Sequence, residues 1–447
     1  MTKELRVRVV QDPSSGFTAL DERAESPDIT VCLDIVSGDR IRARLYGSAV
    51  PSLFGTEHRA DLSVRPDDVR SAGARLCRLW KELVVDFRPP APDGHPDHSG
   101  VEQPYASGVD LSTRPPGELY EILDELAVAG AELLFGTLLG GPDRRVQHFA
   151  AYLAQALAAD DTLRVRFDSE LYIPWPMVCL RPEDVPPPDG GQDRDPASLF
   201  RRFLGHRHRI EQTGGAYPWL GGRHEPPVVP SVSLNHDVHV DRRGRTKAAD
   251  VAVVLAKGTR FVERTTRSEL VRALSDDSLN EHLMYFWCHG HFVPNGSQPA
   301  CLALKLTDQT SIDAQTVRDR RRRFGEGSPF QPFVVLNACH AGVPEGGGDL
   351  AFLGRELIHA GARGVLGPQI EIPQLFAAEY ALEFVTRYLH GAETAGAAAH
   401  AVARRFADEL RNPLGLTYAL HHGMDTRLER AAADPADGTG SGQEVTV

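Results

Sequence analysis

The sequence predicts an α/β fold, a mostly parallel sheet flanked by helices, with a small α+β N-terminal module before it. Two apolar runs, 283–288 and 333–337, have the length and composition of buried strands. Strand-like and helix-like segments alternate from about residue 228 onward, which is typical of a doubly wound sheet. The first 87 residues show a different pattern, a hairpin followed by one helix.

The N-terminal module spans residues 1–87. Residues 28–36 and 40–46 alternate like the strands of a hairpin, and Ser-Gly-Asp between them suits a turn. Apolar residues then recur at helical spacing from Pro66 to about Val85. We expect this module to serve as a sensor or docking surface.

Three further boundaries follow from composition. Residues 88–116 are rich in Pro, Gly and Ser and predict a linker. The main domain is expected at 117–425, interrupted by a Pro- and Asp-rich insert at 182–196. Residues 426–447 predict a disordered tail.

Periodicity within the main domain predicts its individual elements. We expect helices at 118–135, 143–158, 267–274, 312–323, 350–360, 374–389 and 394–410. We expect strands at 163–167, 250–256, 283–288, 301–306, 333–337 and 362–367.

Composition excludes several classes of protein. A net charge of −12 argues against non-specific nucleic-acid binding. No apolar run approaches the roughly 20 residues of a membrane span, and the first residues lack an apolar signal core. We therefore expect a cytoplasmic protein that binds neither nucleic acid nor membranes. The six cysteines form no CxxC pair, which argues against a disulfide framework, and no cofactor is expected.

Cys339 and His289 are the main candidates for chemistry. Each follows one of the two apolar runs, and in open α/β sheets active sites gather at the carboxyl ends of the strands. A cysteine attacks as a thiolate, and a nearby imidazole accepts its proton. Gly290, directly after His289, allows the backbone to approach a ligand closely.

The motifs CHGHF and VVLNACHAG place this histidine fifty residues before this cysteine. In order and spacing they resemble the catalytic motifs of CHAT-domain proteases, which are caspase-like cysteine peptidases related to separase and metacaspases. The segment Ile173–Pro176 resembles the family's PWE element, with Pro176 where relatives carry Glu, and 361–367 resembles the strand after the nucleophile. The resemblance covers roughly residues 117–425 and implies a caspase-like sheet.

The resemblance also implies roles for individual residues. His289 would be the base and Cys339 the nucleophile, with the backbone N–H groups of Gly290 and Cys339 forming the oxyanion hole. Asn337 stands where metacaspases carry an Asp that binds a basic substrate residue, which weakens any expectation of Arg or Lys specificity. Asn337, Asp349 and Glu371 are candidates for the substrate pocket.

Other interpretations of these residues stay open. His291 is a competing base, and His340 is interpreted as part of the wall of the site. A zinc site is a further alternative, although its spacing matches no usual zinc pattern. Its ligands would be Cys288, His289, His291, Cys339 and His340.

The sequence and the resemblance together predict a cysteine endopeptidase that cleaves a specific protein partner. The resemblance implies a role in bacterial or antiviral defence or in regulated cell death, with a gasdermin-like pore former as a candidate substrate. An activator would act through the N-terminal module. The alternative is a catalytically silent, CHAT-like scaffold that binds partners, and retention of both His289 and Cys339 argues against it.

Overall fold

The computed structural model describes residues 26–431 with eight gaps. The gaps are 38–39, 53–55, 90–102, 187–193, 215–225, 296–297, 325–327 and 341–348. The backbone alone is described at 292–295, 298–301, 339–340 and 349–352.

Within the described residues, thirteen strands belong to one sheet. They are β1 (Ile29–Ser37), β2 (Arg40–Tyr46), β3 (His58–Leu62), β4 (Arg164–Ser169), β5 (Arg209–Thr213), β6 (Ser231–His236), β7 (Arg260–Arg264), β8 (Leu283–Asn295), β9 (Gln298–Lys305), β10 (Ser311–Ile312), β11 (Phe333–His340), β12 (Gly364–Pro368) and β13 (Tyr418–His421).

Strand order divides the sheet into two parts joined by β13. The path is β10-β9-β8-β11-β12-β13-β5-β4-β1-β2-β3, and β6 and β7 branch from β8. Strands β7, β6, β8, β11 and β12 are parallel neighbours. Strand β13 runs antiparallel to β12 and parallel to β5, so the sheet continues from the C-terminal part into the N-terminal part.

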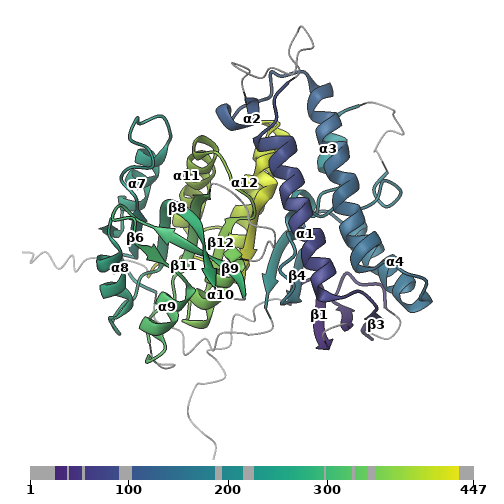
Figure 1. Ribbon diagram of the computed structural model, residues 1–447, viewed down its shortest axis with the longest axis horizontal. Helices are drawn as coiled ribbons and strands as arrows, with labels where there is room; N and C mark the ends of the chain where they lie inside the picture. Colours follow the sequence, from purple (N-terminus) through teal and green to yellow (C-terminus); the bar gives the residue numbers. More distant parts are fainter. Residues whose placement is uncertain are drawn as a thin grey trace, which may run out of the picture.

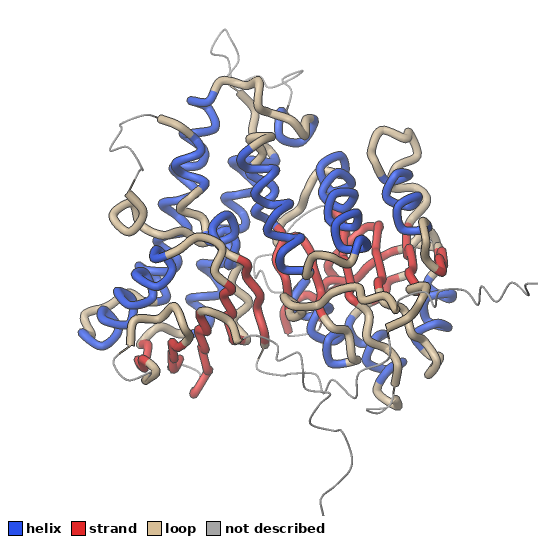
Figure 2. Tube along the Cα trace, turned by 180° about the vertical axis from the view of Figure 1, so that it is seen from behind, coloured by secondary structure: helices blue, strands red, loops and turns tan. Residues whose placement is uncertain are grey.

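Helices cover both faces of the C-terminal part. Figure 1 shows α7 and α11 on one side of β6, β8 and β11, with α8, α9 and α10 on the other, and Figure 2 shows the same two groups from behind. Their bounds are α7 (Ala248–Ala256), α8 (Arg267–Leu274), α9 (Ala314–Arg321), α10 (Asp349–His359) and α11 (Gln374–His390).

The remaining helices belong to the N-terminal part or to the junction. They are α1 (Pro66–Trp80), α2 (Pro104–Ser107), α3 (Pro116–Ala131), α4 (Arg144–Ala159), α5 (Pro196–Phe200), α6 (Leu204–Arg207), α12 (Ala395–Asp408), and the short π or 3₁₀ segments η2 (Lys81–Val85), η3 (Glu132–Leu138), η4 (Trp175–Met177) and η5 (Pro413–Thr417).

Side chains alternate between the two faces of the sheet along β8 and β11. This alternation explains why both strands are apolar at every position in a sheet that helices cover on both faces. Leu283, Tyr285 and Trp287 join the core beneath α7 and α11, whereas Met284 and Phe286 join the second core beneath α8, α9 and α10. Because successive strand residues face opposite sides, a run that is apolar at every position is buried on both. The predicted mostly parallel, helix-flanked, caspase-like sheet is confirmed.

Residues 250–256 are helical, so the strand predicted there is wrong. They belong to α7, in which Val251 and Leu255 are buried and Val253 is 67% exposed. An i, i+4 spacing of buried residues is the helical pattern, and a short β-branched run does not distinguish it from a buried strand. The parallel strands of this region are instead β6 and β7, on either side of α7.

The N-terminal α+β unit is present but does not pack as a separate body. Strand β1 pairs in parallel with β4, from Ile29 opposite Val165 to Leu33 opposite Ser169. Helix α2 and the buried Tyr105 lie inside the predicted linker, so its second half packs on the protein. Residues on both sides of the predicted boundary at 87 share one sheet and one core.

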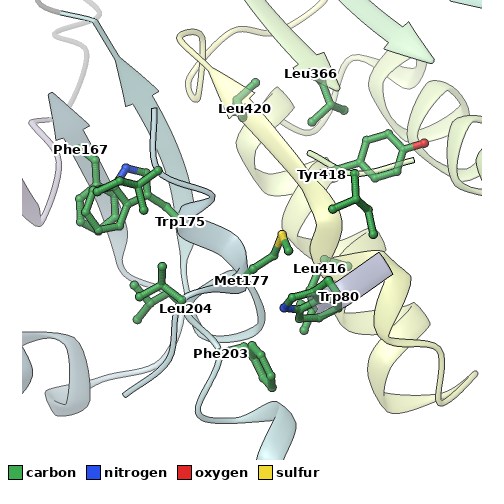
Figure 3. Packing of buried hydrophobic residues seen from close by; sticks show 14 of the residues in the cluster. Trp80, Phe167, Trp175, Met177, Phe203, Leu204, Leu366, Leu416, Tyr418 and Leu420 are labelled. Carbon is green, nitrogen blue, oxygen red and sulfur yellow. The ribbon is translucent and has the colours of Figure 1, made fainter. Parts of the chain in front are cut away.

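Aromatic packing fixes the junction of the two parts. Trp80 of α1 lies edge-on to Phe203, with ring centroids 5.6 Å apart, and Phe167 stacks on Trp175 at 3.6 Å. Figure 3 shows Trp80 near Met177 and Leu416, so residues from three distant stretches of the chain meet in one core. Among the described helices, none combines the length and apolar character that a membrane crossing requires.

Candidate active site

Cys339 and His289 occupy opposing positions in adjacent parallel strands. The pairing of β11 with β8 runs without a register shift from Phe333 opposite Leu283 to His340 opposite Gly290 and sets Cys339 opposite His289. Neighbouring strands lie about 4.8 Å apart. The fifty-residue spacing of the motifs therefore becomes a direct backbone juxtaposition of the two predicted catalytic residues.

His289 lies where β8 extends beyond the end of β6. The last pair between these strands is His236 opposite Trp287, and β8 continues from there between β11 and β9. The His289 side chain is 43% exposed, so its imidazole borders solvent while its strand is central in the sheet. A side chain in this position can contact both solvent-borne ligand and protein.

Asp237 is a site residue that sequence reasoning missed. It follows β6 directly, and its Oδ2 lies 4.0 Å from Nε2 of His289. The carboxylate is 1% exposed, and it accepts hydrogen bonds from the backbone N–H of His239 (2.8 Å) and the side-chain amide of Gln309 (2.7 Å). Its position directly after a strand could have pointed to it, because active-site residues gather at the carboxyl ends of strands. However, β6 contains Ser, Asn and His, so its sequence only weakly predicts a strand.

The competing base, His291, makes its hydrogen bond toward β9 and β10, away from β11. Its Nε2 lies 2.9 Å from the hydroxyl of Ser311, which belongs to the edge strand β10. The register of β11 with β8 ends at Gly290, one residue before it. His289 is thus the histidine that β8 sets opposite Cys339, while the side chain of His340 lies outside the described part of the chain.

The zinc alternative gains nothing from the described side chains. No three described His, Cys, Asp or Glu side chains converge as metal ligands do. Cys288, one of the five residues in that alternative, is buried in the core beneath α8, α9 and α10, on the other face of β8 from Trp287.

Asn337 lies in the interior rather than at a substrate surface. It is 1% exposed, and its side-chain amide donates to the carbonyl oxygen of Ala377 in α11 (2.8 Å) and to the hydroxyl of Tyr285 (3.2 Å). Its oxygen accepts the hydroxyl of Tyr418 at 2.7 Å. These contacts satisfy the side chain internally, so Asn337 does not offer a free group to a substrate.

The other two pocket candidates have different outcomes. Glu371 lies in the loop after β12, and its Oε2 is 3.0 Å from Nζ of Lys81 in η2. Lys81, in the N-terminal region, therefore sets its positive charge beside Glu371, which was predicted to line the substrate pocket. Asp349 is the first residue of α10, and its side chain lies outside the described ones.

The predicted oxyanion donors lie within the strands themselves. Gly290 is buried in β8, opposite His340 on one side and Leu304 of β9 on the other. Cys339 is the next-to-last residue of β11. The assignment of their N–H groups to an oxyanion hole stays a prediction.

The cysteines whose side chains are described are structural. Cys32, Cys77, Cys179 and Cys288 are buried. Burial raises the pKa of the Cys77 thiol to about 12 and also raises the pKa of the Cys32 and Cys179 thiols. A thiol with a raised pKa supplies little thiolate at neutral pH, so these residues are poor nucleophiles.

The mostly parallel sheet and the helices on both of its faces define a caspase-like fold. Residues 242–427 match the family model of the CHAT domain, and the matched stretch includes both His289 and Cys339.

Individual relatives cover less of the chain or resemble it more remotely. A protein of Vitiosangium sp. (strain GDMCC 1.1324) named as a probable protease is 30% identical over 137 residues, which are 31% of this chain and 18% of that protein. Two crystal structures of the Saccharomyces cerevisiae separase–securin complex align with TM-scores of 0.44 and 0.41 at 8% and 10% identity, each over 88% of this chain and 30% of the matched chain. The chain thus spans less than a third of the length of each of these proteins.

Proposed function

We propose that this protein is a cysteine endopeptidase in which His289 and Cys339 form the catalytic dyad. The observation that carries the proposal is the register of β8 and β11, which sets the two residues opposite each other near the carboxyl end of their parallel pairing. Membership of the caspase-like class and the relative named as a probable protease support the same reaction.

The reaction follows from the chemistry of the two groups. His289 takes the thiol proton of Cys339, and the thiolate adds to the carbonyl carbon of a peptide bond. Backbone N–H groups of Gly290 and Cys339 would stabilise the resulting oxyanion. Protonated His289 then gives its proton to the departing amine, leaving a thioester between the substrate's acyl group and Cys339. A water molecule, deprotonated by His289, hydrolyses the thioester and restores the thiol.

The test is cleavage of a proteome-derived peptide library by the wild-type protein and three variants. Cys339→Ala and His289→Ala are expected to abolish cleavage, whereas Cys288→Ala, which removes the neighbouring buried thiol, is expected to retain it. Cut sites would give the preferred residue before the scissile bond. Cleavage that survives Cys339→Ala would overturn the proposal, and binding of a partner without cleavage by any form would favour the scaffold alternative.

The biological setting is a proposal drawn from the CHAT resemblance. The substrate would be one specific protein in bacterial defence or regulated cell death, such as a gasdermin-like pore former. An activator acting through the N-terminal region would have a physical route to the site, since Lys81 already contacts Glu371 in the loop after β12. Cleavage of a purified gasdermin-like protein, compared with the Cys339→Ala variant, tests the substrate directly.

A further inference from the structure

We propose that Asp237 is a positioning residue for His289. Its buried carboxylate orients the imidazole and stabilises the imidazolium that forms when Cys339 loses its proton. The inference rests on the proposed function, because it adds a third member to that dyad. Its test is designed so that either part can fail alone.

The backbone brings Asp237 to the catalytic strand. Strand β6 ends at His236, and the N–H of Asp237 then donates to the carbonyl oxygen of Trp287 at 3.0 Å. This bond ties the residue after β6 to β8 two positions before His289. The side chain can therefore reach the histidine across the end of the shorter strand, where Oδ2 lies 4.0 Å from Nε2.

The carboxylate is held in place on both of its oxygens. Oδ1 accepts the N–H of His239, and Oδ2 accepts the side-chain amide of Gln309, as described above. Gln309 itself is fixed, because its backbone adopts a left-handed conformation (φ +54°) and its side-chain amide also donates to the carbonyl oxygen of Leu306 at 3.0 Å. A carboxylate held by two donors presents its negative charge at a fixed position beside Nε2 of the imidazole.

The charged groups around Asp237 explain why its carboxylate would act on His289. Within the described part of the chain, no Lys or Arg forms an ion pair with Asp237, and His289 is the one basic side chain that lies within 4.0 Å of its carboxylate. A buried carboxylate balanced only by neutral donors is costly, and an adjacent positive charge relieves that cost. The imidazolium that His289 becomes on taking the Cys339 proton would supply that charge.

The same geometry selects the tautomer of the neutral imidazole. With Nε2 directed to the carboxylate, the proton of neutral His289 belongs on Nε2, and the lone pair of Nδ1 is left to accept the thiol proton. A separation of 4.0 Å is longer than a hydrogen bond, and such bonds commonly tighten once a substrate is bound. Asp237 therefore acts through His289 and does not itself contact the reacting atoms.

Two other titratable residues occupy the positions beside His289 in the neighbouring strands. Cys339 is its register partner on β11, and Lys305 is its register partner on β9. A Lys305→Met variant measures the lysine's share of any pH dependence, so that it is not assigned to Asp237.

The experiment measures the rate at which iodoacetamide alkylates Cys339 between pH 5 and pH 9 in the full-length protein, by mass spectrometry of the Cys339 peptide. Asp237→Asn keeps the size of the side chain and removes its charge. At pH 6 it is expected to slow alkylation by about tenfold, since the imidazolium that accompanies the Cys339 thiolate would lose its adjacent negative charge. Asp308→Asn, an exposed acid in the same turn as Gln309, is expected to match the wild type.

Each result distinguishes the two proposals. If His289→Ala slows alkylation but Asp237→Asn follows the wild-type profile, the positioning role is wrong and the dyad stands. If His289→Ala also follows the wild-type profile, the proposed function itself fails. Should Asp237→Asn not fold, Gln309→Ala is the second variant: it releases Oδ2 and is expected to give a smaller loss in the same direction, and an unchanged profile would overturn the inference.

Discussion

Tyr418 donates its hydroxyl to the side-chain oxygen of Asn337 at 2.7 Å, which ties β13 to β11 although β12 lies between them. The contact spans the point where the strands of the candidate site meet the strand that continues the sheet. Asn337 also holds α11 through the carbonyl oxygen of Ala377. One buried amide therefore fixes two strands and a helix beside the proposed nucleophile.

Replacement of Asn337 by Ala is expected to destabilise the protein by about 2–4 kcal/mol, because it removes three buried hydrogen bonds and opens a small cavity. Tyr418→Phe removes one of the bonds and is expected to cost about 1 kcal/mol. Urea unfolding of both variants measures the difference. Equal costs for the two variants would contradict a shared network.

Asn337→Asp is expected to destabilise the protein without creating a preference for Arg or Lys substrates. The side chain is 1% exposed, so the new carboxylate would be buried among groups that already donate and accept internally. Cut-site profiling of the variant against the wild type checks the specificity. A gain in cleavage after basic residues would show that Asn337 reaches the substrate.

The contact between Lys81 and Glu371 is expected to contribute less than about 1 kcal/mol to stability, because both side chains are about a quarter exposed. A double-mutant cycle with Lys81→Met and Glu371→Gln measures the coupling. If the N-terminal region regulates the site through this pair, both single variants should change cleavage rates by more than that stability effect predicts. Unchanged rates in both would remove the pair from regulation.

Stability is expected to fall as the pH drops from about 6.5 to about 4. Burial lowers the pKa of five described histidines, that of His208 to about 3, those of His400, His421 and His422 to about 4, and also that of His359. Above pH 6.5 both folded and unfolded chains hold them neutral, so they have no effect there. Below it the unfolded chain takes up protons that the folded chain refuses, at about 1.4 kcal/mol per pH unit for each histidine.

Urea unfolding at pH 7, 6 and 5 measures this slope. A His421→Gln variant removes one of these histidines and should flatten the dependence of stability on pH relative to the wild type. Equal stability of the wild type at pH 7 and pH 5 would contradict the prediction.

A chain that lacks residues 1–103 is expected not to fold cooperatively. Removing β1 exposes the edge of β4, and removing α1 takes Trp80 from the core that it shares with Phe203. Large-to-small changes at single buried aromatics already cost about 3–5 kcal/mol. Circular dichroism and size-exclusion chromatography compare this chain with one lacking only residues 1–25. A monomeric, cooperatively unfolding fragment would show that the N-terminal region is a separate unit after all.

The sequence predicts the strands that carry the site better than it predicts what surrounds them. Strands β8 and β11 are apolar at every position because both faces are covered, and that pattern is strong. Strand β6 is not, since Ser233 and Asn235 are buried through hydrogen bonds to Glu281 and to the backbone of Tyr285 rather than through apolar packing. Asp237 was missed together with the strand that presents it.

Long-range partners account for the remaining differences. The charge on Glu371 is met by Lys81, 290 positions earlier in the chain, and no local pattern marks that contact. The short strand β13 directly follows the 3₁₀ segment η5. It is recognisable as a strand only from its pairing with β12 and β5. His422 and Gly423 directly follow this strand.

The pairing of β13 with β5 sets an order of events for the growing polypeptide. Gln212 is opposite His421, so a strand made midway through synthesis waits for more than two hundred further residues before its neighbour exists. Until then the nascent chain holds two half-sheets with open edges at β5 and β12, and open edges invite pairing with the wrong partner. Non-local pairing of this kind is slow to form. The joining of the two half-sheets therefore depends on four residues, Tyr418–His421, that are synthesised late but lie in the middle of the finished sheet.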